Sequence, residues 1–290
     1  MPFLSLLPHI CAPSVNIARL SATCDGGEML RKIVILATAT TILLAADATQ
    51  PAPSLRDPAK KEIAMQLVSA AENSSLDWKA QYAYIEYNVE GNEKENRGYT
   101  AGIIGFTSRT HDMLELVEYY AQIAPDNPLA KYLPALRKVD DTPSKEGLGK
   151  PFEQDWKTAG ADPKFREAQD HERDRTYFDP AVTLAQSDGL RALGQFLYYD
   201  AVVMHGEDGM RAVRRAAMKK TKRPIDGGDE TAYLNAFLDA RKAEMKKEQG
   251  HTDTTRVDTM QRVFVQESNL DLHPPLHFKV YGDPYVIDAK

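Results

Sequence analysis

The stretch SAAENSSLDWKAQYAYIE, residues 69–86, contains the end of a predicted helix and the approach to a predicted sheet. The helix begins at Asp57 and Pro58, an N-cap residue followed by a residue suited to the first turn. Apolar residues then recur at helical spacing, at Ile63, Leu67, Val68 and Ala71. Residues 73–75 (NSS) end the helix, so Glu72 is predicted at its C-terminus.

Glu72 is the first candidate catalytic residue. A helix dipole puts partial negative charge at its C-terminus, which disfavours an ionised carboxylate there. Leu67 and Val68 are expected to add desolvation. A carboxylic acid that is protonated near neutral pH is what a general acid requires. Taken alone, however, a glutamate at a helix end is more often an ordinary surface residue.

The rest of the chain is predicted to be mostly helical. Residues 84–106 (YIEYNVEGNEKENRGYTAGIIGF) favour a β-hairpin or a small three-stranded sheet, because Tyr, Val and Ile alternate with Gly and Asn. Helices are then expected from residue 110, from Asp162 and from Asp179, with 181–205 as the longest and most central. Further helices are expected at 229–248 and 256–266. The predicted fold class is α+β, predominantly helical, with one small antiparallel sheet near the N-terminal end.

The N-terminal residues have the pattern of a targeting segment. Residues 29–32 (MLRK) are basic, residues 33–46 are apolar but short for a bilayer span, and residues 46–48 (ADA) resemble a cleavage site. We therefore expect an upstream extension at 1–28, a signal peptide at 29–48 and a secreted mature chain at 49–290. The loop at 140–151 is expected to separate two lobes of that chain, with no membrane association after processing.

Composition excludes several classes of function. The chain is 42% hydrophobic and 27% charged, which is typical of a globular protein. Cys11 and Cys24 precede the expected cleavage site, so thiol catalysis and thiolate metal sites are not expected in the mature chain. The net charge of −6 disfavours nucleic acid and favours cationic partners. The basic run at 218–223 (MKKTKR) is therefore interpreted as a solvated helix end.

Motifs for nucleotide phosphates, zinc proteases and serine hydrolases are absent from the sequence: it has no GxxxxGK[ST], GxGxxG, HExxH or GxSxG. His111 has no second histidine at ligand spacing, so it is expected to be a helix-start residue rather than a metal ligand. We expect no metal and no cofactor. Carboxylates are the remaining candidates for chemistry.

A helix that ends in a glutamate, followed by a small sheet with further acids, is similar to the layout of lysozyme-like glycosidases. In those enzymes two carboxylates face each other across a cleft between two lobes. Over almost the whole mature chain, the sequence also closely resembles glycoside hydrolase family 46 chitosanases. The blocks that carry this resemblance include KKEIAMQLVSAAENSSLDWKAQYAYIE (60–86), RGYTAGIIGF (97–106), ERDRTYFDPAV (172–182), DGLRALGQFLYYDAVVMHG (188–206), GGDETAYLNAFLDARKA (227–243), TRVDTMQRVF (255–264) and YGDPYVI (281–287).

The resemblance implies a secreted, endo-acting hydrolase of β-1,4-linked glucosamine polymer (chitosan) that works with inversion. It implies a single catalytic domain at 49–290 with a lysozyme-like, two-lobed fold, and we expect a monomer. Glu72 matches the general acid, and Thr100 matches a residue that helps to hold the attacking water. The resemblance assigns the other matching positions to two groups: substrate binding by Tyr84, Asp112, Tyr177 and Glu248, and a buried charge network of Asp200, Arg241 and Arg256.

The general base is the main departure from the family pattern, which usually reads E-D-x-G-D-G-R-G-Y-T with the second Asp as the base. Here the stretch from Glu86 to Thr100 is five residues longer. Counting forward from Glu86 puts Glu90 at the base position, whereas counting back from Thr100 puts Glu95 there. The base and Thr100 must converge on one water, which favours Glu95 and leaves Glu90 open.

A second departure lies at Thr252, where relatives often have Asp, so Asp253 is expected to take its place in the cleft. Acids there can bind the ammonium groups of a polycationic polymer. Two alternatives remain: a non-catalytic polysaccharide-binding protein that lost its base, and a lysozyme-type peptidoglycan hydrolase. The acidic cleft argues against the latter, because cell-wall polymers are not polycations.

Overall fold

The computed structural model describes residues 54–89, 91–94, 96–247 and 253–289. The expected signal peptide, both cysteines, Glu90, Glu95 and Glu248 lie outside the described residues. Within the described ranges, no helix combines the length and apolarity needed to cross a membrane.

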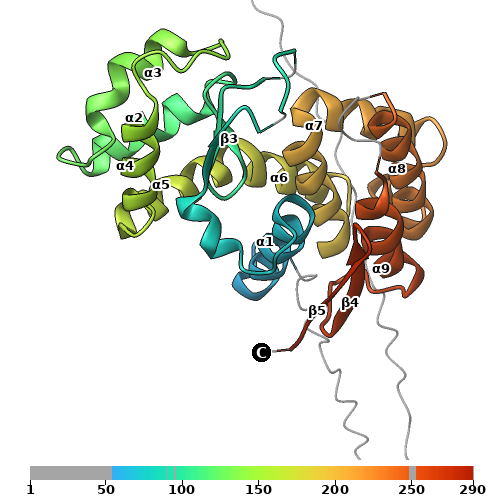
Figure 1. The fold of residues 1–290 in the computed structure, drawn as a ribbon. Helices are drawn as coiled ribbons and strands as arrows, with labels where there is room; N and C mark the ends of the chain where they lie inside the picture. Colours follow the sequence, from blue (N-terminus) through green and yellow to red (C-terminus); the bar gives the residue numbers. More distant parts are fainter. Residues whose placement is uncertain (1–53, 90, 95, 248–252, 290) are drawn as a thin grey trace, which may run out of the picture. The chain divides into compact units, whose positions relative to one another are not determined.

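The described chain is predominantly helical, with two small antiparallel sheets (Figure 1). Its helices up to residue 173 are α1 (Pro58–Asn73), η1 (Trp78–Ala83), α2 (Asp112–Ile123), η2 (Ala130–Tyr132), α3 (Leu133–Val139), α4 (Lys150–Ala159) and α5 (Pro163–Arg173). The later ones are η3 (Asp174–Phe178), α6 (Asp179–Ser187), α7 (Ala192–Met218), η4 (Pro224–Asp226), α8 (Glu230–Met245), η5 (Arg256–Gln261) and α9 (Arg262–Gln266). The strands are β1 (Ile85–Tyr87), β2 (Tyr99–Ala101), β3 (Phe106–Thr107), β4 (Leu276–Val280) and β5 (Asp283–Ile287).

Helix α1 begins and ends close to where its sequence predicts. Asp57 occupies the N-cap position with extended backbone, and Pro58 lies in the first turn. Ser74 ends the helix in the left-handed conformation, at φ 50°, which stops further helical hydrogen bonding. Glu72 therefore lies in the last turn of α1.

The predicted small sheet is confirmed as three antiparallel strands in the order β1-β2-β3. Glu86 pairs with Thr100, and Tyr87 pairs with Tyr99. Residues directly opposite each other in such a pair project from the same face. The buried Tyr99 ring makes edge contacts with Tyr87 and with Phe152 of α4, which fixes the sheet against that helix.

One prediction of helix boundaries is wrong. The segment 181–205 is not one helix, because α6 ends at Ser187 and α7 begins at Ala192 after a turn in which Gly189 has φ 80°. The predicted helix start at Asp179 is confirmed, since α6 begins there with Pro180 in its first turn. The π-helical turn η3 joins this start directly to the end of α5.

The C-terminal hairpin β4–β5 is a structural element that sequence analysis missed. Its two-residue loop is Tyr281 and Gly282, both with positive φ, as tight hairpins favour. Strand β4 alternates buried and exposed residues and packs against η5. This contact brings the last strands of the chain to the segment that carries Arg256.

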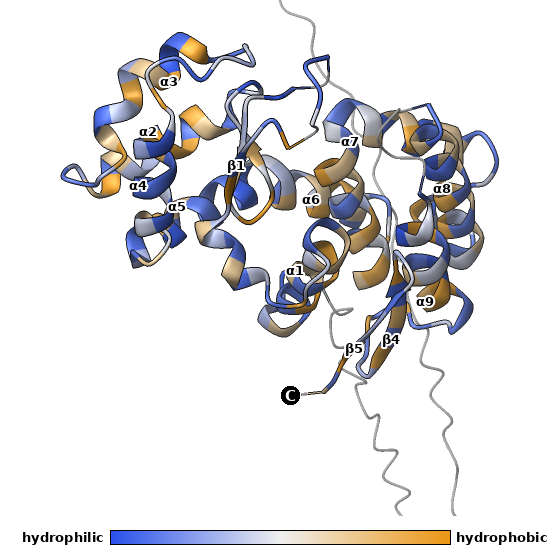
Figure 2. Cartoon of the chain, viewed as in Figure 1, coloured by the Kyte–Doolittle hydropathy of each residue, from blue (hydrophilic) through white to orange (hydrophobic). Residues whose placement is uncertain are grey.

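The core is centred on the first half of α7, as expected. Residues 192–202 of this helix are buried, and α7 packs mainly on α8 and α6. Figure 2 shows apolar residues gathered on the facing sides of these helices. The helix is interrupted at Gly206, where φ 68° and ψ 176° are not helical.

A buried carboxylate fixes the turn between α6 and α7. Asp188 accepts hydrogen bonds from Arg214 Nε at 2.6 Å, Arg223 Nη1 at 2.9 Å and Tyr198 Oη at 2.7 Å. Burial opposes ionisation, but these partners outweigh it and lower the pKa of Asp188. Arg223 belongs to the basic run at 218–223, so this member of the run is not simply solvated.

Candidate functional site

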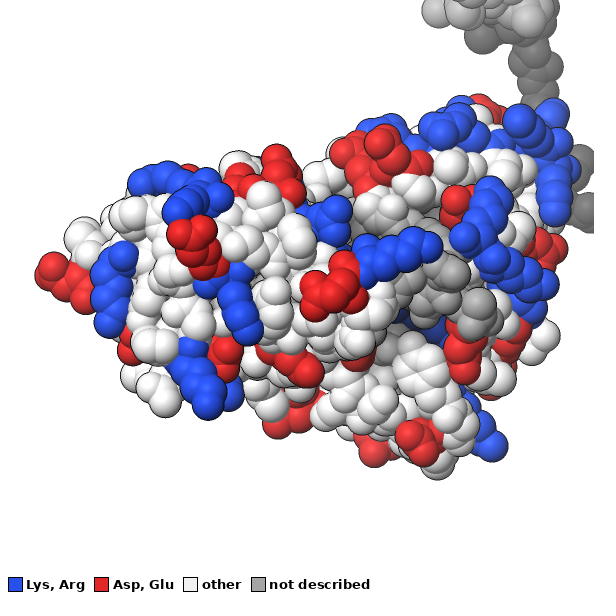
Figure 3. Space-filling model, turned by 45° about the horizontal axis from the view of Figure 1, so that its top comes forward, with Lys and Arg blue, Asp and Glu red and all other residues white. Residues whose placement is uncertain are grey.

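Residues from distant parts of the chain line a cavity of about 340 Å³. It contains five of the predicted site residues: the candidate acid, the sheet threonine, two candidate substrate-binding residues and one arginine of the charge network. The lining residues are Glu72, Arg97, Thr100, Ile104, Gly105, Thr107, Thr110, Asp112, Tyr177, Val202, Val203, Met204, Gly206, Arg256 and Tyr281. Figure 3 shows that basic and acidic side chains are interspersed over the face it draws.

Glu72 reaches the cavity from the last turn of α1, and its Oε1 accepts a hydrogen bond from Arg256 Nη1. The side chain of Glu72 is 36% exposed. Leu67 and Val68 are buried in the core, but burial does not extend one turn further to Glu72, which is at the cavity. A guanidinium, rather than apolar burial, is the principal neighbour of this carboxyl group.

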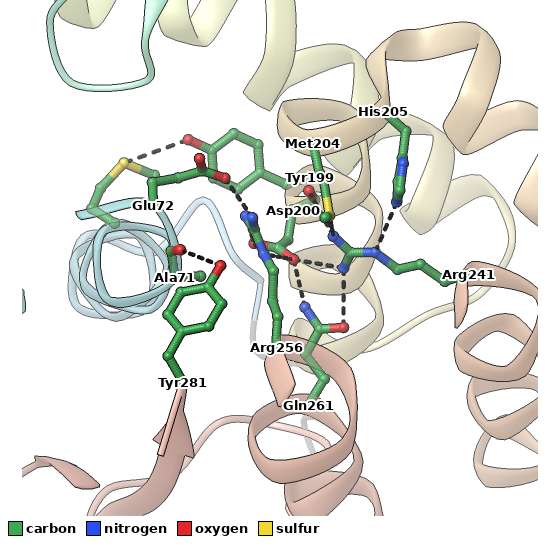
Figure 4. A network of polar contacts seen from close by, with 11 residues as sticks. Ala71, Glu72, Tyr199, Asp200, Met204, His205, Arg241, Arg256, Gln261 and Tyr281 are labelled. Atoms are coloured by element: carbon green, nitrogen blue, oxygen red, sulfur yellow. Dashed lines mark hydrogen bonds and ion pairs between the residues drawn. The ribbon is translucent and has the colours of Figure 1, made fainter. Parts of the chain in front are cut away.

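Behind Glu72 lies a buried network of charges, drawn in Figure 4. Asp200 of α7 is fully buried and pairs with Arg256 Nη2 at 2.6 Å and with Arg241 Nη1 at 2.6 Å. Gln261 Nε2 also donates a hydrogen bond to Asp200, at 2.5 Å. Burial opposes ionisation of Asp200, but the charges of Arg256 and Arg241 dominate and lower its pKa to about 2.

This network joins four elements at one point. Arg241 comes from α8, Arg256 and Gln261 come from η5, and Glu72 comes from α1. Arg241 Nη2 also donates to the main-chain oxygen of Asp200 at 3.2 Å, so the contact includes backbone as well as side chains. Two guanidinium groups face two carboxyl groups, and this balance is what makes burial of the arginines tolerable.

Asp112 and Tyr177 form a second polar pair in the cavity. Tyr177 donates its hydroxyl to Asp112 Oδ2 at 2.9 Å. The other oxygen of Asp112 accepts from Thr107 N at 2.9 Å and from Thr110 Oγ1 at 2.8 Å. Burial raises the pKa of Asp112 even though these hydrogen bonds oppose the shift. Asp112 is thus a rigidly held carboxyl group rather than a mobile surface acid.

Thr100, in the middle of β2, is one of the residues that line the same cavity. Its Oγ1 is buried and makes no hydrogen bond within the described ranges of the chain. A buried hydroxyl without a partner is uncommon in proteins and calls for an explanation.

Two predicted substrate-binding residues, Tyr84 and Asp253, are not among the described residues that line the cavity. Tyr84 donates its hydroxyl to Glu86 Oε2 at 3.1 Å. Asp253 accepts hydrogen bonds from the amide and the hydroxyl of Thr255, at 2.7 and 2.5 Å, and so supports the start of η5. These contacts place both residues beside the elements of the site.

The other lining residues were not predicted as site residues, and Arg97, Met204 and Tyr281 are among them. Tyr281 comes from the hairpin loop near the C-terminus, and its hydroxyl donates to the main-chain oxygen of Ala71 at 3.0 Å. The alternation of residues 276–280 and 283–287 about Tyr281-Gly282 is a hairpin signal that could have revealed the element. No sequence signal places it beside α1.

Both π-helical turns carry a site residue: Tyr177 lies in η3 and Arg256 lies in η5. Such turns add a residue to a helix and re-aim its side chains, and they occur often at functional sites. Within the described residues, no cluster of three His, Cys, Asp or Glu is arranged to hold a metal ion. His111 precedes α2 and pairs with Asp140 at 2.5 Å.

Comparison with known proteins agrees with the geometry. The chain matches glycosyl hydrolase family 46 over residues 66–276. A chitosanase from Streptomyces sp. (strain N174) is 61% identical over 249 residues, which cover 84% of this chain and 88% of the relative. A chitosanase from Nocardioides sp. (strain N106) is 60% identical over 242 residues, covering 82% of this chain and 85% of the relative.

Solved structures extend this similarity to the fold. A co-crystal structure of a chitosanase with substrate has a TM-score of 0.77 and 51% identity, covering 82% of this chain and all of the other. The chitosanase of Gynuella sunshinyii, solved with chitotetraose, has a TM-score of 0.70 and 33% identity, covering 79% of this chain and 98% of the other. The predicted lysozyme-like α+β fold is confirmed. On this evidence of sequence, fold and site, the chain belongs to glycosyl hydrolase family 46.

Proposed function

We propose that the protein is a secreted, monomeric endo-chitosanase that hydrolyses β-1,4-glucosaminidic bonds with inversion. Glu72 protonates the glycosidic oxygen, and Glu95 or Glu90 deprotonates a water held near Thr100 on the opposite face of the sugar. One observation carries the proposal. The same cavity is lined by Glu72, a carboxylic acid at a helix end, and by Thr100, a sheet residue whose buried hydroxyl has no hydrogen-bond partner among the described residues. The relatives named chitosanases, at 61% and 60% identity, support the choice of substrate.

The described neighbours of the two candidate bases favour Glu95. Asn96 is fully buried, and its Oδ1 accepts a hydrogen bond from Gly98 N at 2.8 Å. Arg109 Nη1 donates to the main-chain oxygen of Asn96 at 3.0 Å, and the next residue, Arg97, lines the cavity. By contrast, Val89, the residue before Glu90, is 41% exposed. The anchored asparagine next to Glu95 in the sequence supports the choice of Glu95 as the proposed base.

Both the local charge of the cavity and the net charge of the chain support the proposed substrate class. Glucosamine units carry ammonium groups, and Asp112 offers them a fixed carboxyl group inside the cavity. Glu248 and Asp253 would extend this recognition along the polymer, with Tyr84 and Tyr177 providing aromatic contacts. The net charge of −6 favours encounter with a polycation at a distance.

The charge network is proposed to hold Glu72 in place. Asp200 fixes the guanidinium of Arg256 through two of its nitrogens, Nε and Nη2, which leaves Nη1 directed at Glu72. Arg241 holds Asp200 from the other side. The candidate acid is thus positioned by residues that do not reach the sugar themselves.

Replacement of the proposed acid tests the catalytic assignment. Glu72→Gln should lower turnover of chitosan at least about 100-fold, the usual scale for loss of a general acid, while binding of glucosamine oligomers persists. Reducing-end release measures turnover, and calorimetry measures binding. Glu118→Gln is the control, because this exposed glutamate pairs with Arg137 away from the cavity. Turnover by Glu72→Gln close to wild type would refute the role of Glu72.

The base is identified by comparing Glu95→Gln, Glu90→Gln and the double variant. We expect Glu95→Gln to lower kcat at least about 100-fold and Glu90→Gln to have a small effect, since only one carboxylate can activate the water. The opposite order would assign the base to Glu90. If all three variants keep a low wild-type rate, the protein is a polysaccharide-binding protein without a catalytic base.

The stereochemistry of the reaction is a separate prediction. An inverting enzyme should release α-anomers first, because water attacks the face opposite the leaving group and the two carboxyl groups stand about 6.5–9.5 Å apart. Proton NMR during the first minutes of digestion separates the anomers. Initial release of β-anomers would exclude inversion. Faster clearing of peptidoglycan than of chitosan would favour a lysozyme-type hydrolase instead.

Asp200→Asn should lower both stability and turnover, because it removes the anion that holds two buried guanidinium groups. We expect a loss of about 3–5 kcal/mol in the free energy of unfolding and a fall in kcat of the folded protein. Asp188→Asn is the matched control. It also removes a buried carboxylate that pairs with two arginines, but Asp188 is not among the described residues that line the cavity. Equal effects of the two variants on kcat would contradict the positioning role.

The same carboxyl group sets an acid limit on stability. The pKa of Asp200 is lowered to about 2 in the folded chain, against about 3.9 for an unfolded Asp. Its contribution, about 2–3 kcal/mol, is therefore full above pH 4 and is lost as the pH falls toward 2. Urea unfolding between pH 7 and 2 should show a weaker acid dependence in Asp200→Asn than in the wild type.

A further inference from the structure

Tyr281 lines the cavity, but neither the sequence nor the proposed mechanism supplies a role for it. It lines the cavity together with Glu72 and Arg256, although it lies in the loop between β4 and β5. The residue is 49% exposed, which is unusual for a large aromatic side chain beside a folded core. An exposed ring in a polar cavity is a candidate contact for a ligand.

The ring is fixed before any ligand arrives. The hydroxyl of Tyr281 donates to the main-chain oxygen of Ala71 at 3.0 Å, one of the carbonyl groups that a helix end leaves without an amide partner (Figure 4). The amide of Tyr281 donates to Thr255 Oγ1 at 3.0 Å, beside Arg256. Both ends of the residue are therefore tied to the segments that carry Glu72 and Arg256.

These hydrogen bonds decide which part of Tyr281 remains for a ligand. The hydroxyl is already engaged with Ala71, so a sugar would meet the ring rather than the hydroxyl. A ring held in one orientation loses little conformational entropy when a ligand packs on it. The π-face of tyrosine attracts cations electrostatically.

Charged groups of both signs lie near Tyr281. The guanidinium of Arg256 has the largest electrostatic effect on it, and the carboxyl groups of Glu72, Asp253 and Asp200 act in the opposite direction. Arg256 is already paired with Glu72 and Asp200. The face of the ring, rather than a surplus of acidic groups, is therefore what Tyr281 offers to an ammonium group.

We infer that Tyr281 is a substrate-binding residue whose ring receives the ammonium-bearing face of the glucosamine unit next to Glu72. This inference rests on the proposed function and adds a specificity element to it. The ring selects a free amine over an N-acetyl group, because only the amine is cationic and gains from the aromatic face. Its hydroxyl serves to hold the ring, so the role resides in binding rather than in proton transfer.

Three variants separate this role from a structural one. Tyr281→Leu keeps apolar volume but removes the π-face, and it should raise KM for glucosamine oligomers about 5- to 30-fold with kcat within about twofold. Tyr281→Phe keeps the ring and should leave KM within about threefold. Tyr285→Ala, in the same hairpin, is the matched control: Tyr285 stacks on Phe278 and is not among the described residues that line the cavity.

The outcomes are distinguishable. If Tyr281→Leu and Tyr281→Phe both lower kcat while KM is unchanged, the hydroxyl merely positions α1 and the inference is overturned. An unchanged KM in Tyr281→Leu also overturns it. Competition by a fully N-acetylated tetramer should be affected less than about twofold by Tyr281→Leu, and an equal loss for both ligands would refute selection of the amine. Wild-type turnover of chitosan is measured first, since its absence would refute the proposed function instead.

Discussion

One buried carboxylate organises the site of this protein. Asp200 lies on the most buried helix, and its charge is stable there only because Arg241 and Arg256 approach it from different elements. The cost of burying these charges is met only when all partners are present, so the network forms together with the fold. Through Arg256 this constraint reaches Glu72 at the end of α1, and the position of the proposed acid depends on it.

Local irregularities of the backbone supply the rest of the geometry. The π-helical turns η3 and η5 aim Tyr177 and Arg256, and the break of α7 at Gly206 lies at the cavity wall. The positive-φ hairpin loop presents Tyr281. In a regular helix or strand, the direction of each side chain is set by the repeat of that element. The interruptions change this direction and turn these side chains toward the cavity.

The sequence was informative where the signal is local. The start and end of α1, the three-stranded sheet and the helical class all follow from capping residues, periodicity and alternation within short windows. It was misleading at 181–205, where the apolar periodicity suggested one helix but a turn after Ser187 separates α6 from α7. It also did not show what contacts Glu72, because Leu67 and Val68 are buried while Glu72, one turn later, is partly exposed and pairs with Arg256.

By itself, then, the sequence determined the fold class, the family resemblance and the position of Glu72 at a helix end, since these depend on patterns within a few turns or on long matching blocks. Only the tertiary structure decided what surrounds Glu72. Its contact with Arg256 spans 184 residues, and the contact between Tyr281 and Ala71 spans 210. Contacts of that range are set by packing of the whole core, for which local propensity carries no information.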